Sequence, residues 1–421
     1  MSLFSALMAS VSGLQAQANA LSTISDNIAN ADTTGYKEAN TQFQDMLSSV
    51  SASDYNAGGV STIVTYGISQ QGGLSSTTSP TDLAIQGNGF FVVQNASGAP
   101  LLTRAGSFTQ NSAGTLVNAS GFTLLGEPIA PGATATAAIN GVAQLVPVTI
   151  NPVSLIANPS TTGTLVANLD SNAAVDTGTL PSANSAASTF TSKTSVTAYD
   201  DLGNPVNLDV YFTNLGGGQW EADVYNAADA TNGGFPYMNG GVADTPLVTQ
   251  NLTFDPTTGA LTSSGTLTVP VPNGQNLNID IGSMTQLAST FSVSNNTTNG
   301  NAPAKFQQLS VSQDGTLSEV YSNGTTVPVF QIPLATVASV NSLTPVAGDA
   351  YQANEQSGSI VVGDANAGGF GSINSNELES STVDLATELT NMVVAQNSYT
   401  ANSKVFQVGS DLLQELSNLV K

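Results

Sequence analysis

Catalytic chemistry in this chain is limited to carboxylate, hydroxyl and tyrosine side chains, because the sequence contains no cysteine and no histidine. Their absence excludes thiol nucleophiles, imidazole bases, disulfides and most zinc sites. The adjacent carboxylates Asp200 and Asp201 could in principle bind calcium, but their segment lacks the alternating oxygen ligands of a calcium loop, and we predict an Asx turn. A glycosidase needs two acids across a cleft, and no segment indicates such a pair.

A glycine-rich segment, Gly87-Asn88-Gly89, precedes Phe90 in the manner of a phosphate-binding loop. No helical pattern, lysine or third glycine follows it where phosphate binding would need one, so we predict a tight turn between strands. The sequence therefore predicts a protein that is not an enzyme and has no catalytic residue, no cofactor and no metal site.

The charge balance excludes further classes of partner. Six Lys and Arg face 29 Asp and Glu, for a net charge of -23. No segment concentrates positive charge, so nucleic acid is not expected to bind. No apolar run approaches the roughly 20 residues of a membrane span, and we expect no membrane insertion. Ala16-Gln17-Ala18 imitates a signal-peptide cleavage site, but no basic segment precedes it, and we expect no cleaved signal peptide.

The elements at the two ends of the chain carry the most regular pattern. Near the N-terminus, apolar residues recur in alternating steps of three and four, which is the heptad pattern of a helix that packs along one stripe. Asn30 and Gly35 tolerate a left-handed backbone and predict the end of this helix. The stripe consists of Phe4, Leu7, Val11, Leu14, Leu21 and Ile28.

A second heptad pattern closes the chain. Ser381 followed by Asp384 resembles a capping box and predicts a helix that starts near Thr382. The apolar residues of this helix recur every seven positions at Leu385, Met392, Tyr399, Phe406, Leu413 and Val420, with Leu389 beside them.

We interpret the two terminal helices as a coiled-coil pair, although ordinary amphipathic helices on a globular core would show a similar pattern. Small or polar residues such as Ser25, Gln396 and Ser403 interrupt the predicted seam. Such a pair should be marginal in an isolated chain and stable only when neighbouring copies cover its remaining faces.

Between the helices the sequence is rich in short strands separated by turn residues. Three similar turns, Asn95–Gly98, Asn111–Gly114 and Asn118–Gly121, separate strands over residues 83 to 125. Asp314-Gly315 and Asn323-Gly324 predict consecutive hairpins. The stretch from about 151 to 304 is flanked by linker-like composition and carries 11 acids and one lysine, which indicates an inserted domain.

The predicted fold class is α+β, mainly β: long terminal α-helices pair as a coiled coil, with two β-rich domains between them, the outer one inserted in the inner one. By residue number, the predicted parts are 1–30 with 382–421 for the coiled coil, 31–77 with 350–381 for a connecting segment, 78–150 with 305–349 for the inner β domain, and 151–304 for the outer β domain.

The segment from Ser25 to Lys37 resembles the signature shared by the flagellar rod, hook and hook-associated axial protein family. Ala84–Val93 with Thr103–Phe108 resembles the β core of that family, and residues 383–404 resemble its closing helix. The signature positions in this chain are Asn27, Ala29, Asn30, Thr34, Gly35, Tyr36 and Lys37.

Within this family the chain is longer than rod proteins, and Thr197–Pro205 with Trp220 resembles the outer domain of hook proteins. The resemblance implies a structural subunit that self-assembles into a flexible helical tube, a universal joint that transmits motor torque from rod to filament. A distal rod subunit is the nearest alternative, and a secreted β-rich adhesin is a more distant one.

The resemblance also implies partners and a location. The partners would be further copies of the chain, the distal rod, the hook cap, the hook-filament junction proteins and the flagellar type III export apparatus. Phe43 and Leu47 resemble a segment that early export substrates present to the export gate. The location would be the extracellular flagellum.

Overall fold

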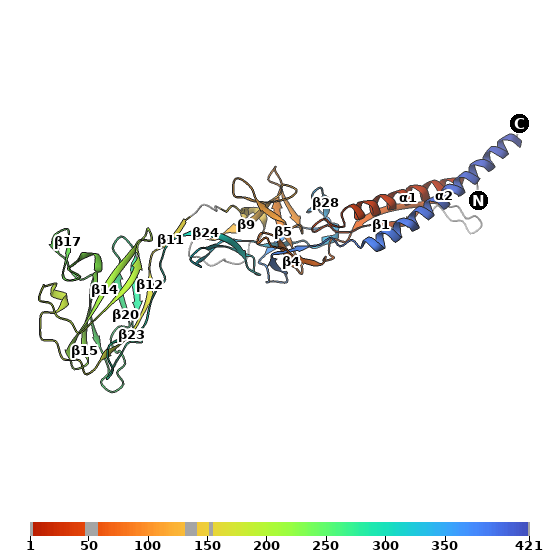
Figure 1. The fold of residues 1–421 in the computed structure, drawn as a ribbon. Helices are drawn as coiled ribbons and strands as arrows, with labels where there is room; N and C mark the ends of the chain where they lie inside the picture. The colour runs from red at the N-terminus through yellow and green to blue at the C-terminus, as the bar shows by residue number, and fades with distance from the viewer. Residues whose placement is uncertain (1–2, 47–57, 131–140, 151–154, 420–421) are drawn as a thin grey trace. The chain divides into compact units, whose positions relative to one another are not determined.

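The computed structural model describes residues 3–46, 58–130, 141–150 and 155–419. The chain separates into two compact units, which are described separately (Figure 1). The first unit contains Met1–Pro152, Gln307–Val320 and Gly324–Lys421, and the second contains Val153–Phe306 with Tyr321–Asn323. The fold is mainly β with a helix at each end, which confirms the predicted fold class.

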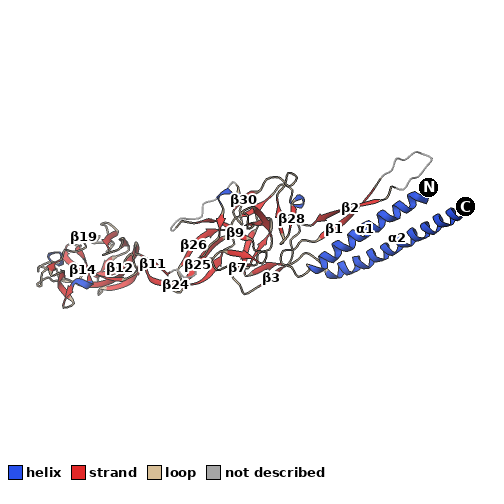
Figure 2. Cartoon of the chain, turned by 90° about the horizontal axis from the view of Figure 1, so that it is seen from above, coloured by secondary structure: helices blue, strands red, loops and turns tan. Residues whose placement is uncertain are grey.

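The two helices of the first unit, α1 (Leu3–Ala29) and α2 (Leu385–Leu419), pack side by side as predicted (Figures 1 and 2). The predicted start of α2 was wrong by three residues. Asp384, not Ser381, caps the helix: its Oδ1 accepts hydrogen bonds from the backbone N–H of Ala386 at 2.9 Å and Thr387 at 3.3 Å. The Ser381 hydroxyl instead accepts from Val383 N–H in the preceding turn.

The end of α1 also differs from the prediction in its mechanism. Asn30 is not in the left-handed conformation; its side-chain amide donates to the carbonyl of Asp26 at 2.9 Å, and its Oδ1 accepts from the Thr33 hydroxyl at 3.2 Å. Gly35 does have a positive φ of 74°. The chain therefore leaves the helix through a side-chain cap and turns at the glycine.

A hairpin that the sequence did not predict lies along α1 (Figure 2). It consists of β1 (Ala39–Asp45) and β2 (Val60–Tyr66), with Thr41 opposite Val64. Two hydroxyl contacts attach it to the helix: Thr41 to Thr23 at 2.8 Å and the Asn19 amide to Thr62 at 2.7 Å. One side of α1 is therefore covered by this hairpin.

The rest of the first unit is β. Its main sheet has the order β25-β26-β9-β5-β6-β29-β28, and two small sheets pair β3 with β32 and β4 with β31. The strands are β3 (Leu74–Ser76), β4 (Leu83–Gln86), β5 (Phe90–Gln94), β6 (Pro100–Thr103), β7 (Phe108–Gln110), β8 (Leu116–Asn118), β9 (Thr123–Pro128), β10 (Val146–Pro147), β25 (Thr316–Tyr321), β26 (Thr326–Gln331), β27 (Leu334–Thr336), β28 (Thr344–Val346), β29 (Ala350–Gln352), β30 (Val361–Gly363), β31 (Ser372–Ser375) and β32 (Glu377–Glu379).

The three predicted turns Asn95–Gly98, Asn111–Gly114 and Asn118–Gly121 share one hydrogen-bond pattern. In each, the asparagine Oδ1 accepts from the backbone N–H two and four residues later, at 2.9 to 3.1 Å. Gly98, Gly114 and Gly121 have φ values of 80° to 82°. The predicted Asx turn at Asp200 has the same pattern, with Leu202 and Asn204 as donors. These turns fix the strand boundaries that the sequence indicated.

The second unit is built from two main sheets around one apolar core that includes the buried side chains of Trp220, Leu208 and Leu277. β24 (Asn301–Val311) returns the chain to the first unit. The other strands are β11 (Leu155–Asn158), β12 (Thr162–Asp170), β13 (Ser192–Tyr199), β14 (Pro205–Gly216), β15 (Gln219–Asn226), β16 (Ala230–Thr231), β17 (Gly234–Asn239), β18 (Val242–Ala243), β19 (Val248–Thr253), β20 (Thr266–Pro270), β21 (Asn276–Asp280), β22 (Thr285–Leu287) and β23 (Ser292–Thr298).

Neither helix of the described residues is long and apolar enough to cross a membrane. Over the same residues, acids do not gather in any group of three that could hold a metal ion.

Candidate functional site

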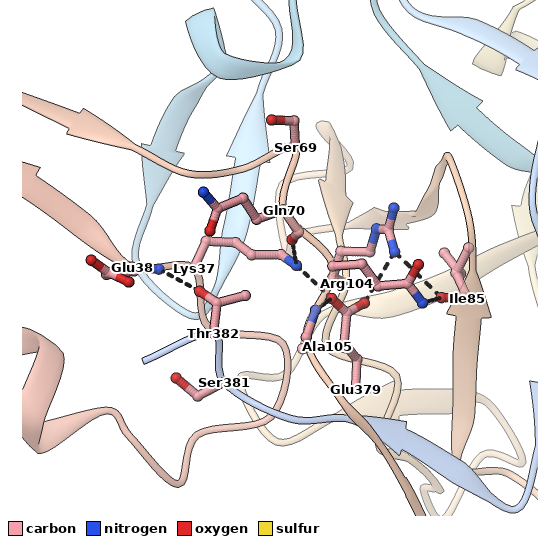
Figure 3. Close-up of polar contacts among 12 residues, drawn as sticks. Lys37, Glu38, Ser69, Gln70, Ile85, Arg104, Ala105, Glu379, Ser381 and Thr382 are labelled. Atoms are coloured by element: carbon pink, nitrogen blue, oxygen red, sulfur yellow. Dashed lines mark hydrogen bonds and ion pairs between the residues drawn. The ribbon is translucent and has the colours of Figure 1, made fainter. Parts of the chain in front are cut away.

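Three passes of the chain meet at the Glu379 carboxylate, at the end of β32 next to the start of α2 (Figure 3). Its Oε1 accepts from Lys37 Nζ at 2.5 Å and from the backbone N–H of Gly72 at 2.8 Å. Lys37 Nζ also donates to the carbonyl of Gln70. The segments after α1, after β2 and before α2 are thus joined at one buried acid.

Arg104, which follows β6, brings the main sheet to the same acid. Its Nη1 lies 3.0 Å from Glu379 Oε2, and its Nη2 donates to the carbonyl of Gly87 at 2.7 Å. The guanidinium also lies over the Phe90 ring, 5.2 Å from the centroid. We call Lys37, Arg104 and Glu379 the ionic junction.

The ionic junction is removed from water, which makes it costly to disturb. The side chains of Lys37 and Glu379 are 0% exposed. Burial lowers the pKa of Lys37 and of Arg104, and the Glu379 carboxylate opposes this shift in both. Two of the six cations in the chain are therefore held by a single carboxylate, and loss of that carboxylate would leave both unpaired.

Backbone hydrogen bonds strengthen the same connection. Gly35 N–H donates to the Glu379 carbonyl at 2.8 Å, and Thr382 N–H donates to the Tyr36 carbonyl at 3.2 Å. The Thr382 hydroxyl accepts from Glu38 N–H at 2.9 Å. The segment leaving α1 and the segment entering α2 are therefore held together, and the two helices emerge from one fixed origin.

The signature residue Asn27 attaches the hairpin to this origin. Its side-chain amide donates to the Ala39 carbonyl at 2.8 Å, and its Oδ1 accepts from Ala39 N–H at 3.0 Å and from the Tyr36 hydroxyl at 3.1 Å. Of the other signature residues, Ala29 is exposed at the last position of α1, and Thr34 is half-buried. The signature residues therefore contribute more to the contacts around the ionic junction than to the packing of α1.

We expect Gly35→Ala to destabilise the first unit by more than about 2 kcal/mol. A Cβ at this position would lie 2.7 Å from the backbone nitrogen of Ala105, and a left-handed alanine adds its own cost of roughly 1–2 kcal/mol. The measurement is denaturant unfolding followed by far-ultraviolet circular dichroism.

Gly98→Ala is the matched control for that variant. Gly98 has a φ of 82°, but a Cβ added there would have no other atom within 4 Å, so only the backbone cost applies. Equal losses in the two variants would show that the close approach of residue 35 to Ala105 is unimportant.

Small and polar residues, rather than those of the predicted apolar stripe, are the most buried residues of α1. The buried positions of α1 include Ser10, Gly13, Ala20 and Asn27. Each of these lies one residue before a position of the predicted stripe (Val11, Leu14, Leu21, Ile28), and one residue rotates the side-chain direction by about 100°. The most buried positions of α1 are therefore offset by one residue from the predicted stripe, although the pairing itself was correct.

The buried positions of α2 are also occupied by small or polar residues. Glu388, Ala395 and Gly409 are buried at multiples of seven residues. A Cβ on Gly409 would lie 2.7 Å from Leu7 Cδ2, and a Cβ on Gly13 would lie 2.9 Å from Asn402 Nδ2. Residue 7 faces residue 409 and residue 13 faces residue 402, so the helices run antiparallel in close contact. Leu7, a residue of the predicted stripe, thus lies at the contact with α2.

Many apolar side chains of the predicted stripes remain exposed. In α1 the stripe residues Leu7, Leu14, Leu21 and Ile28 are half-buried. Phe4 is 68% exposed, Met392 is half-buried, and the other described large apolar side chains of α2 are 39% to 59% exposed. Exposed apolar side chains in this number indicate an interaction surface. Besides Phe4, the exposed large apolar side chains of the two helices are Met8, Val11, Leu385, Leu389, Val393, Val394, Tyr399, Val405, Phe406, Val408, Leu412 and Leu413. Val420 lies outside the described residues.

A cavity of about 280 Å³ lies between α1, β1 and α2. Phe43, from the predicted export segment, lines it with Val394 and is half-exposed; Leu47 lies outside the described residues. Glu388 also lines it, and burial together with the nearby Glu38 raises the pKa of Glu388. Its lining residues contain no arrangement of acid, base and nucleophile.

Glu379 and Arg104 are the residues that sequence reasoning missed. The scarcity of cations was the available signal, because the chain has only six Lys and Arg and a buried one needs a partner. The identity of that partner among 29 acids depends on a contact across 342 residues of sequence.

Comparison with known families matches four parts of the chain. A flagella basal body rod protein family covers residues 7–37, and the D1 domain of the flagellar hook protein FlgE/F/G family covers 84–155. The flagellar basal body protein FlaE D2 domain covers 168–301, and the C-terminal family of flagellar basal body rod FlgEFG proteins covers 374–419.

Curated relatives match over the whole length. The flagellar hook protein FlgE of Brucella suis biovar 1 (strain 1330) is 45% identical over 100% of both chains. That of Escherichia coli (strain K12) is 31% identical over 97% of this chain and 98% of the relative. The crystal structure of the Helicobacter pylori flagellar hook protein FlgE2 shares the fold, with a TM-score of 0.51 and 16% identity over 73% of this chain and 100% of that one. This chain therefore belongs to the flagellar hook protein family, whose members are structural and not enzymatic.

Proposed function

We propose that copies of this chain assemble through the exposed apolar faces of α1 and α2 into a flexible helical tube, with these helices as its inner layer. The proposal rests mainly on the distribution of side chains on the helix pair, which is the reverse of that in an ordinary coiled coil. Small and polar residues hold the two helices together, while Phe4, Val11 and the apolar residues of α2 face outward.

The exposed apolar area sets the energetics of assembly. Each apolar side chain that leaves water contributes about 1.5–3 kcal/mol when fully buried. The fully buried side chains of α1 and α2 are small or polar, such as Ser10, Ala20 and Ala395, while large apolar ones remain exposed, so neighbouring copies would supply additional apolar burial. Assembly and ordering of the helices are then linked, because a partner that binds the ordered state stabilises it.

The remaining parts would form the outer layers of the tube. We assign 31–77 with 350–381 to the joint above the helices, 78–150 with 305–349 to the inner β domain and 151–304 to the outer β domain. Head-to-tail contact between non-identical faces generates an open helix of subunits. Bending of the tube requires units that are rigid in themselves and slide against their neighbours. The ionic junction supports that rigidity in the first unit.

The partners and export route belong to the same proposal. The tube would contact the distal rod at one end and the hook cap or hook-filament junction proteins at the other. Export through the flagellar type III apparatus suits a chain without cysteine, because no disulfide prevents unfolding. Phe43 and Leu47 would be read by the export gate in the unfolded chain, and the assembled tube would be extracellular.

Removal of both terminal segments, residues 1–30 and 382–421, tests the proposal. We expect the full chain to form hollow tubes by electron microscopy and the shortened chain to form none. Fluorescence of Trp220, which is buried in the second unit, would show that the shortened chain remains folded there. Hollow tubes from the shortened chain would contradict the proposal. Removal of 151–304 should instead leave tubes that form but do not curve normally.

A further inference from the structure

Two carboxylates lie side by side on one face of β15 in the second unit. Trp220, Ala222 and Val224 point into the apolar core, so Glu221 and Asp223 point to the opposite face of the sheet. Both are nevertheless buried: Glu221 is 8% exposed and Asp223 is 0% exposed.

Neighbouring segments satisfy some of their oxygens and leave one without a partner. The Ser182 hydroxyl donates to Glu221 Oε1 at 2.8 Å, and the Thr249 hydroxyl donates to Asp223 Oδ1 at 2.5 Å. Asp223 Oδ2 is buried and has no hydrogen-bond partner among the described residues. An ionised carboxylate oxygen in that position would lose its hydration without compensation.

The surrounding ionisable groups provide no free cation. Lys193 on β13 lies 2.8 Å from Asp209 Oδ2 on β14 and is paired with it. Tyr211 on β14 stands opposite Asp223 in the sheet register, and Tyr225 follows on β15 itself. Tyr237 on β17 stacks on Tyr225, and Asp244 after β18 adds a further acid near it. Among these described groups Lys193, whose ammonium lies over the Tyr211 ring, is the cation, and it is already paired.

We propose that Asp223 and Glu221 share one proton in the folded second unit. A proton on Asp223 turns its unpartnered oxygen into a donor toward the neighbouring Glu221 carboxylate. It also removes the repulsion between two buried like charges. The pair then acts as a pH-sensitive element of the outer β domain, a role that is independent of assembly through the helices.

The electrostatics agree with this geometry. Burial, and next to it the Glu221 charge, raise the pKa of Asp223 to about 7. The unfolded chain has an ordinary aspartate pKa of about 3.9. Between these values the folded unit holds a proton that the unfolded chain has lost, so its stability falls as the pH rises and levels off above the folded pKa.

Other aspartates of the unit give the opposite slope. Hydrogen bonds from Asn204 lower the pKa of Asp200, and those from Thr257 lower the pKa of Asp255, so both favour the folded state as the pH rises. The pH dependence of the stability of the wild type is therefore the sum of these opposite contributions. A comparison with Asp223→Asn isolates the contribution of the pair, because asparagine keeps a donor toward Glu221 and cannot ionise.

The test is denaturant unfolding of the full-length protein, followed by fluorescence of Trp220, the only tryptophan in the chain and the neighbour of Glu221. Between about pH 5 and about pH 8, the unfolding constant of the wild type should rise at least tenfold relative to that of Asp223→Asn. A ratio that stays constant with pH would overturn the proposal.

Three further measurements keep the result decisive. Asp280→Asn, at an exposed strand position of the same unit, should keep the wild-type pH dependence. If Asp223→Asn does not fold, Glu221→Gln should remove the same pH dependence, and its retention would contradict a shared proton. The third measurement adds millimolar Ca²⁺ at about pH 8. If Ca²⁺ raises the denaturant midpoint of unfolding of the wild type but not that of Asp223→Asn, the pair binds a cation instead of sharing a proton, and the proposal is overturned.

Discussion

Glu379→Gln is expected to destabilise the first unit by about 3–5 kcal/mol, the cost of removing one partner from a buried ion pair. Glutamine keeps the shape of the side chain, but it leaves Lys37 and Arg104 as two buried cations without a counter-charge. The segments that join α1, β3 and α2 would separate, because the Lys37 ammonium is more stable when it is hydrated. Amide hydrogen exchange over residues 35–38 and 70–76 measures the loss directly.

The control for this variant is Glu377→Gln, two residues earlier on β32. Glu377 is half-buried and accepts from the Asn374 amide at 2.9 Å, which glutamine can also do, so we expect a change within about 0.5 kcal/mol. Trp220 fluorescence should report an unchanged second unit in both variants. Equal and small effects of the two substitutions would show that the ionic junction contributes little.

Val408→Asp is expected to prevent assembly while leaving the single chain folded. Val408 is 59% exposed on α2, and an aspartate there lies four residues after Lys404, a spacing at which opposite charges attract on a helix. In a tube the new carboxylate would be buried against a neighbouring copy and lose its water. We expect the concentration needed for polymerisation to rise by at least about 100-fold, equivalent to about 2.7 kcal/mol.

Gln407→Asp adds the same charge one residue earlier and serves as the control. It belongs to an exposed polar stripe of α2 formed by Asn397, Thr400, Lys404, Gln407 and Asp411. This stripe has no apolar surface to bury, so its variants should polymerise near the wild-type concentration. Sedimentation of polymer from monomer over a concentration series gives both values. Loss of assembly in both variants would mean that charge alone, and not the apolar face, decides it.

The terminal helices could be predicted because heptad periodicity is a local property of the sequence. The seam could not be placed, because the prediction assumed that apolar residues face the nearest partner. In this chain the close partner packs against Gly13, Ala20 and Gly409, where small side chains let the backbones approach. The apolar side chains that stay exposed, such as Phe4, Val11 and Leu389, are therefore available for contacts that a single chain does not make, and the heptad pattern carries no information on which partner they meet.

The Asn-Gly turns and Asp200 were predicted correctly because each turn is closed by its own residues. The hairpin of β1 and β2 was missed for the opposite reason, since it is attached by Thr23 and Asn27 of a different element. The ionic junction has the same non-local character. Glu379 becomes distinctive only when the fold brings Lys37 and Arg104 to it.

Amide hydrogen exchange over α1 and α2, compared between isolated chain and assembled tube, tests most directly the claim that the terminal helices depend on neighbouring copies. We predict rapid exchange over residues 3–29 and 385–419 in the isolated chain and strong protection in the tube. The β15 amides of the second unit should be protected in both states and provide the internal reference. Strong protection of both helices in the isolated chain would contradict the account.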